Sequence, residues 1–125
     1  MFMNKEFLYK DITEKVIRCF YNVHDELGGG FLESVYEKAL LIELNEAGLK
    51  AEPQKILTVK YKNKIIGEFK TDIVVEDKII LELKAVGNLI PEHEAQLINY
   101  LKATGIKLGI LVNFGEKLEF QRRIY

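Results

Sequence analysis

Apolar residues recur at helical spacing in three stretches of the chain, and a glycine follows each stretch. This spacing is typical of amphipathic helices, and glycine is common just after a helix ends. We therefore expect three helices: residues 11–27, 32–47 and 91–104. Pro91 suits the first position of the third helix, because the backbone N–H that proline lacks would have no partner there.

Shorter apolar runs, in which polar residues alternate with apolar ones, lie between the second and third helices and after the third. They predict five strands: residues 54–61, 65–75, 79–83, 108–113 and 117–124. The order helix, helix, three strands, helix, two strands predicts an α/β fold with a mixed sheet flanked by helices. The strand–helix–strand passage over residues 78–112 is expected to form a right-handed crossover.

The central hairpin, residues 69–85, carries charged side chains on otherwise apolar strands. Side chains alternate between the two faces of a strand, so Glu82 and Lys84 share one face while Leu83 lies on the other. Antiparallel pairing brings Asp72 close to the end of the following strand. Burying such charges is costly unless they are paired or bind a metal. The pattern indicates either a partly exposed salt-bridge cluster or a functional site.

Length and composition fit a single globular domain over residues 1–125. Of the 125 residues, 48% are hydrophobic, which is enough for a core. The one cysteine, Cys19, excludes an internal disulfide and suits a reducing compartment. No apolar run is long enough to cross a bilayer, and the N-terminus lacks the features of a signal peptide. We expect a cytoplasmic protein without membrane contact.

The formal net charge of −1 excludes a uniformly basic nucleic-acid-binding protein, but the charge is uneven. Residues 50–70 contain six lysines and two glutamates, whereas residues 72–94 contain six acidic residues and two lysines. A basic surface beside an acidic pocket would give this pattern, and so would solvated strand edges. Because affinity for DNA depends on neutralising phosphates, weak overall basicity suggests help from a homodimer or a protein partner.

A metal site follows if Glu33 converges with Asp72 and Glu82, because clustered carboxylates repel one another unless a cation neutralises them. Oxygen ligands without a Cys/His set point to Mg²⁺, with Mn²⁺ as the alternative, rather than to zinc. Lys84 would then position or help activate a water, or stabilise the transition-state charge. Taken alone, Glu33 is better explained as an acidic residue at a helix N-terminus.

Two polar residues of the third predicted helix, Gln96 and Tyr100, lie along one stripe beside the apolar face. Gln96 would orient a water or a phosphate, and Tyr100 would stack on or hydrogen-bond to a substrate. No Ser-His-Asp or Cys-His set offers competing chemistry.

Four motifs in the chain resemble known families. Asp72 followed by Glu82-Leu-Lys84 resembles the PD-(D/E)xK nuclease core, and Gln96-Leu-Ile-Asn-Tyr100 resembles the QxxxY motif of its RecB-like branch. Gly30-Phe-Leu-Glu33-Ser-Val-Tyr36 resembles the signature of the small GxxExxY proteins in that superfamily, as does Leu-Val-Asn113-Phe114-Gly115 near the end. The resemblance covers almost the whole chain, with the motifs in the right order.

The resemblance implies a restriction-endonuclease-like core. It implies metal contacts from Asp72 and Glu82, with Glu33 as an additional direct or water-mediated contact and the backbone carbonyl of Leu83 completing the set. The predicted catalytic residues are Glu33, Asp72, Glu82, Lys84 and Gln96, and the predicted substrate-binding residues are Tyr36 and Tyr100.

The leading hypothesis is a Mg²⁺-dependent nuclease that hydrolyses phosphodiester bonds in DNA. The alternative is a non-catalytic domain that binds nucleic acid or a protein on the same fold, since a fold does not determine a function. A phosphohydrolase acting on nucleotides or small phosphates is a third interpretation.

Overall fold

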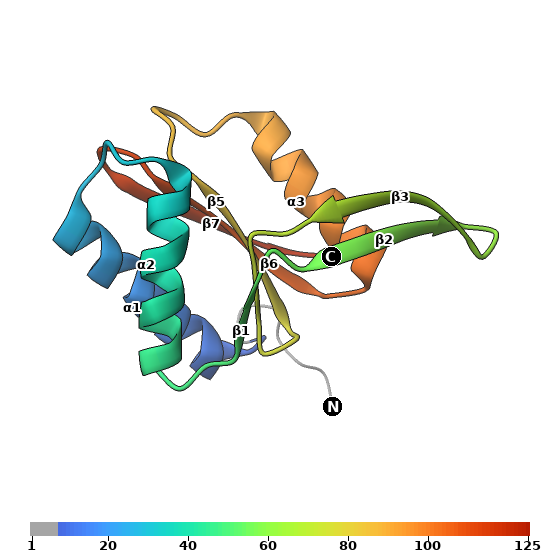
Figure 1. The fold of residues 1–125 in the computed structure, drawn as a ribbon, viewed down its shortest axis with the longest axis horizontal. Coiled ribbons are helices and arrows are strands. Elements are labelled where there is room, and N and C mark those ends of the chain that lie inside the picture. Colours follow the sequence, from blue (N-terminus) through green and yellow to red (C-terminus); the bar gives the residue numbers. More distant parts are fainter. Residues whose placement is uncertain (1–7) are drawn as a thin grey trace.

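The computed structural model describes residues 8–125, and within them three helices pack around a five-stranded mixed sheet (Figure 1). The helices are α1 (Lys10–Leu27), α2 (Glu33–Glu46) and α3 (Pro91–Thr104). The strands are β1 (Ala51–Pro53), β2 (Ile56–Tyr61), β3 (Lys64–Lys70), β4 (Ile73–Val75), β5 (Ile79–Lys84), β6 (Leu108–Phe114) and β7 (Leu118–Ile124). The predicted helices and the mixed α/β sheet are confirmed. None of the described helices is long and apolar enough to cross a membrane.

The sheet has the strand order β1-β4-β5-β6-β7, and its two faces are covered by different helices (Figure 1). Strands β5 and β6 are parallel, with α3 connecting them, and the other neighbouring pairs are antiparallel. Helices α1 and α2 pack on the face that carries Leu81 and Leu83. Helix α3 packs on the opposite face, against Val74, Ile80 and Leu111. By strand alternation, Glu82 and Lys84 belong to the α3 face.

Close packing of α3 on the sheet depends on a glycine in β6. A Cβ atom at Gly109 would lie 2.6 Å from Cδ1 of Leu97, which is closer than the two atoms can approach. The missing side chain therefore lets the backbone of β6 and the apolar face of α3 approach one another. This packing holds the polar residues of α3 over the end of β5.

The strand predicted over residues 65–75 is wrong as a single element, and β1 was not predicted at all. The structure breaks the run at Thr71 and Asp72, so that β4 belongs to the five-stranded sheet and β3 pairs with β2 outside it. The break arises because the chain bends opposite Gln54, which has a φ of 52°. The sequence gives one sign of the break, because residues 70–72, Lys-Thr-Asp, are three polar residues in a row between apolar stretches.

A single antiparallel ladder nevertheless runs through the bend. Ala51 faces Val75 in the sheet and Ile56 faces Lys70 beyond it, which is the same register. Across the bend, the Gln54 N–H donates to the Asp72 carbonyl at 2.9 Å and the Thr71 N–H donates to the Lys55 carbonyl at 3.0 Å. The β2–β3 hairpin is thus an extension of the β1–β4 pair that projects from the body of the protein (Figure 1). We call it the hairpin arm, residues 56–70.

Candidate functional site

Two hydrogen bonds hold Asp72 against the Glu82-Leu83 segment at the end of the β4–β5 ladder. The Asp72 N–H donates to Oε1 of Glu82 at 3.2 Å, and the Leu83 N–H donates to Oδ2 of Asp72 at 2.7 Å. Ile73 pairs with Leu81, so continuing this register by one position sets Asp72 opposite Glu82. The side chains replace the next ladder bonds, and two carboxylates meet where the sheet ends.

Both carboxyl groups have raised pKa values. Burial is the main reason that the pKa of Glu82 rises to about 8, and the charge of Asp72 adds to the effect. Burial likewise raises the pKa of Asp72 to about 6, although the hydrogen bond from Leu83 opposes that shift. The positive charge of Lys84 lowers both pKa values without cancelling the shifts. The folded protein thus disfavours ionisation of both acids at once, and Lys84 offsets this effect only in part, an arrangement common at functional sites.

Lys84 lies at the end of β5, on the same face of the strand as Glu82, and it is half-buried. It forms no salt bridge with any of residues 8–125, yet its charge acts on the carboxyl groups of both Asp72 and Glu82. The Lys84 amine therefore stands near the two acids while remaining available for a third group.

Glu33 is the first residue of α2 and its side chain is exposed. Its charge contributes to the raised pKa values of Asp72 and Glu82, so it lies on their side of the molecule. Within residues 8–125, however, no three His, Cys, Asp or Glu side chains come close enough to form a metal site. The structure does not bring Glu33 into a direct three-carboxylate set, and a contact through bound water stays a prediction.

Gln96 and Tyr100 of α3 lie beside the acidic pair. The pKa of Tyr100 is raised by burial and by the charges of Glu82 and Asp72, and a hydrogen bond with Gln96 opposes the shift. The Tyr100 ring also stacks on Phe69 of β3, with ring centroids 4.1 Å apart and planes 7° apart. Tyr100 thus connects the acidic pair to the root of the hairpin arm.

Tyr36 does not lie where a substrate could reach it. The side chain is fully buried and stacks on Phe114 with centroids 4.8 Å apart. Its hydroxyl donates to the Gly28 carbonyl at 2.6 Å and accepts from the Phe31 N–H at 3.2 Å. These contacts give Tyr36 a structural role, as the side chain that holds the glycine loop before α2, and they argue against the predicted substrate contact.

We expect Tyr36→Phe to lower the free energy of unfolding by about 1–2 kcal/mol, because two backbone groups of the loop lose their partner. Urea denaturation would measure the change, with Tyr21→Phe as the control, since the Tyr21 side chain is half exposed. If the variant kept its stability but lost affinity for nucleic acid, the result would support the predicted role of Tyr36 in substrate binding.

A framework of backbone contacts, which the sequence did not reveal, surrounds this loop. Asn113 accepts from the Val86 N–H and donates to the Val86 carbonyl, both at 2.9 Å, and so fixes the segment that leads into α3. The His24 ring bonds the Gly115 carbonyl at 2.8 Å. A Cβ at Gly29 would lie 2.8 Å from the same carbonyl oxygen. The glycine run and the Asn113-Phe114-Gly115 segment were the available signals, because they mark where backbones touch.

Comparison with known proteins identifies the family. The family model of the PD-(D/E)XK nuclease superfamily matches residues 10–124. The chain belongs to the PD-(D/E)XK nuclease superfamily. As a member of that superfamily it has the predicted restriction-endonuclease-like fold, and membership suggests a nuclease-like function on nucleic acid. No curated protein matches the chain significantly.

The crystal structure of SSO0001 is similar to this PD-(D/E)XK domain, with a TM-score of 0.59 and 19% sequence identity. The match covers 73% of this chain and 48% of that chain, so this chain spans about half the length of that protein. Similarity at this level concerns the fold alone.

Nucleases of the PD-(D/E)XK superfamily generally use divalent metals, and the residues at this site fit such an ion. Asp72 and Glu82 supply carboxylate oxygens, and burial disfavours their ionised forms unless a nearby positive charge compensates. Mg²⁺ is usually held by one or two carboxylates together with waters and substrate oxygens, so two acids suffice. Without sulfur or imidazole ligands, the donor set is better suited to Mg²⁺ or Mn²⁺ than to zinc.

Proposed function

We propose that this protein is a Mg²⁺-dependent nuclease that hydrolyses phosphodiester bonds in DNA, and that it belongs to the GxxExxY group of the RecB-like branch. The observation that carries the proposal is the pairing of half-buried Asp72 with buried Glu82, with Lys84 on the same strand face as Glu82. A salt-bridge cluster that served stability would pair its charges. Here the two acids repel one another and Lys84 forms no salt bridge with the described residues.

Asp72, Glu82 and the backbone carbonyl of Leu83 are the proposed metal ligands, and Glu33 would contribute through a water. The bound ion would lower the pKa of a water and polarise the phosphate. The reciprocal bonds between Asp72 and the Glu82-Leu83 segment hold the carboxylates in place before substrate arrives, so little reorganisation is needed.

The remaining residues act on the substrate. Lys84 would orient the attacking water and stabilise charge that develops on the phosphate, because its amine lies close to the acids and carries no competing salt bridge among residues 8–125. Gln96, exposed at the start of α3, would orient the water or a phosphate oxygen. Tyr100 would contact the nucleotide next to the reacting bond with its hydroxyl, since one face of its ring already stacks on Phe69.

Calorimetric titration with Mg²⁺ and Mn²⁺, beside a plasmid cleavage assay, tests the proposal. We expect the wild type to bind the ion and to cleave DNA, and Asp72→Asn to lose most of both. Asp77→Asn is the matched control, because Asp77 lies in the β4–β5 turn at the other end of the same strands, exposed and paired with lysines.

Three results would contradict the proposal. Cleavage by Asp72→Asn at the wild-type rate would remove the acidic pair from the chemistry. DNA binding without cleavage in any divalent metal would make the protein a binding domain on a nuclease fold, and faster cleavage of mononucleotides than of DNA would make it a phosphohydrolase.

A further inference from the structure

The hairpin arm begins at the proposed active site. Asp72 lies at the bend where the β1–β4 ladder leaves the sheet, and its carbonyl accepts a hydrogen bond across that bend. Phe69, near the end of β3, stacks on Tyr100, so the root of the arm is braced against α3. The arm extends from there into solvent (Figure 1). A ligand bound at Asp72 and Glu82 would therefore pass directly beside the arm.

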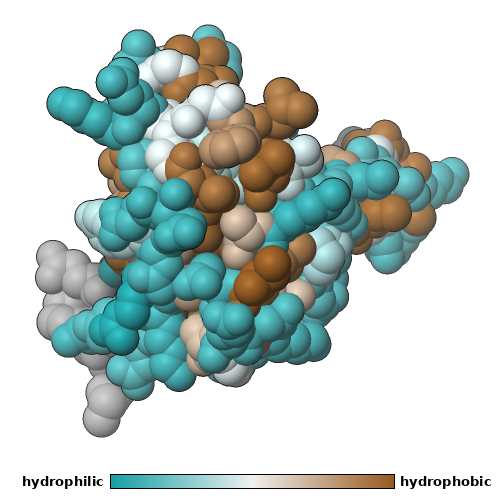
Figure 2. Space-filling model, turned by 60° about the vertical axis from the view of Figure 1, so that its left-hand side comes forward, coloured by the Kyte–Doolittle hydropathy of each residue, from teal (hydrophilic) through white to brown (hydrophobic). Residues whose placement is uncertain are grey.

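The charge of the arm is opposite to that of the chain as a whole. Residues 56–70 contain four lysines and one glutamate, whereas the chain has a net charge of −1. All four lysines, which are Lys60, Lys62, Lys64 and Lys70, are exposed. In Figure 2 the arm projects at the right with mostly hydrophilic side chains and apolar ones between them. Positive charge is thus placed on the element that extends from an acidic site.

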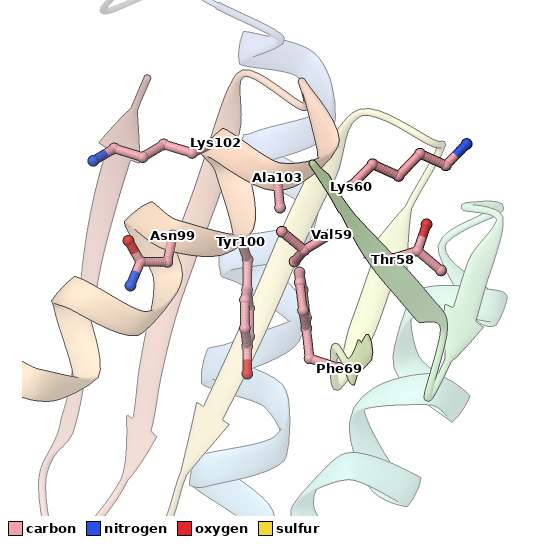
Figure 3. A pocket seen from close by; sticks show the side chains of 8 residues that line it. All are labelled: Thr58, Val59, Lys60, Phe69, Asn99, Tyr100, Lys102 and Ala103. Atoms are coloured by element: carbon pink, nitrogen blue, oxygen red, sulfur yellow. The ribbon is translucent and has the colours of Figure 1, made fainter. Parts of the chain in front are cut away.

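A groove of about 700 Å³ separates the arm from α3. Its floor is apolar: Val59 and Phe69 from the arm point toward Tyr100 and Ala103 of α3 (Figure 3). Lys60 and Lys102 extend away from this floor on opposite sides, and Asn99 lies on the side of Lys102 (Figure 3). A polymer with apolar surface between two rows of negative charge would match this arrangement.

We propose that the hairpin arm binds the phosphate backbone of duplex DNA on one side of the bond that the nuclease cleaves. This proposal rests on the proposed function and names the part of the substrate that lies away from the reacting phosphate. Eight residues separate Asp72 from Lys64, so an extended strand reaches roughly 25 Å from the site to the tip. With a rise of 3.4 Å per base pair, the arm follows about seven base pairs.

The chemistry of the arm favours duplex DNA over other occupants. Single-stranded nucleic acid is held by aromatic platforms, and the exposed aromatic side chain on the arm is Tyr61 alone, at the tip. A second copy of the chain would set one group of lysines against another across a symmetric contact. Exposed Ile65 and Ile66 lie between lysines of the arm and would contact sugars along a groove wall. Lysines that neutralise phosphates make binding strongly dependent on salt.

The test compares charge-removing variants in a Lys84→Ala background, so that the DNA stays intact. Fluorescence anisotropy with a labelled duplex of about 24 bp, measured at several salt concentrations, gives the affinity and its salt dependence. We expect Lys62→Gln/Lys64→Gln to weaken binding about 10-fold near 0.1 M salt and to reduce the slope of log K against log salt by about 2.

Lys15→Gln/Arg18→Gln is the matched control. It removes the same charge from exposed positions of α1, which packs on the sheet face opposite α3, and its affinity should stay within about twofold of the background. An arm variant that binds like the background, with the same slope, would overturn the proposal. Plasmid cleavage by the wild type, and its loss in Asp72→Asn, would still support the nuclease.

Analytical ultracentrifugation tests the remaining alternative, in which a second copy of the chain binds the arm. If Lys62→Gln/Lys64→Gln or Ile66→Ser shifted a monomer–dimer equilibrium without changing DNA affinity, the arm would be an interface between two copies of the chain and the proposal would be overturned. An unchanged sedimentation profile together with weaker DNA binding would support it.

Discussion

Lys84→Ala is expected to lower the rate of DNA cleavage by about 10²–10³-fold or more, to the limit of detection, while the affinity for Mg²⁺ stays nearly the same. The Lys84 amine lies on the face of β5 that carries Glu82, and its charge acts on both acidic side chains. It is not a metal ligand, so its removal leaves the carboxylate oxygens in place. What is lost is the group that stabilises charge developing on the phosphate.

Single-turnover cleavage and calorimetry on the same preparation would measure the two effects. Lys78→Ala is the control, because Lys78 is an exposed lysine in the turn before the same strand. Wild-type cleavage by Lys84→Ala would show that the assigned chemistry is wrong. A parallel loss of metal affinity would instead assign Lys84 to the support of the acidic pair.

Glu82→Gln is expected to abolish both metal binding and cleavage, and at the same time to stabilise the metal-free protein. The amide removes a negative charge that burial disfavours, yet its carbonyl oxygen can still accept the hydrogen bond from the Asp72 N–H. The activity lost with this variant therefore reflects the missing ligand and not a missing fold. Asp72 and Glu82 thus lower the stability of the folded protein, and the proposed function requires both of them.

The stabilising effect of Glu82→Gln is expected to depend on pH. The pKa of Glu82 is about 8 in the folded protein against an ordinary value of 4.5, so between these values the folded state keeps a proton that the unfolded state releases. Stability is therefore lost as the pH rises through this window. We expect Glu82→Gln to be more stable than the wild type by about 4 kcal/mol at pH 8, with little difference near pH 4.

Urea denaturation in a chelating buffer at several pH values would measure the difference. Glu119→Gln is the control, because Glu119 is an exposed glutamate on β7. A Glu82→Gln variant that was less stable at pH 8 would show that the carboxylate is favourably solvated or paired in the folded state.

The sequence predicted the position of some residues correctly and missed that of others. Strand alternation placed Glu82 and Lys84 on one face, because the face of a strand residue depends only on its spacing from its neighbours in the sequence. The same reasoning did not place the bend at Thr71 and Asp72, because a short polar run such as residues 70–72 is also compatible with an exposed part of one continuous strand. Tyr36 and Glu33 lie three residues apart in one motif, yet one is buried and the other exposed.

The sequence by itself determined the three helices, the mixed α/β class, the charge imbalance and the ordered motifs of the superfamily. These properties depend on residues that are close together in the chain or on their identity alone. Only the tertiary structure decided that Asp72 bonds the Glu82-Leu83 segment, that Tyr36 holds the glycine loop and that the β2–β3 pair leaves the sheet as an arm. Such features depend on pairing between residues far apart in the chain, which local periodicity does not encode.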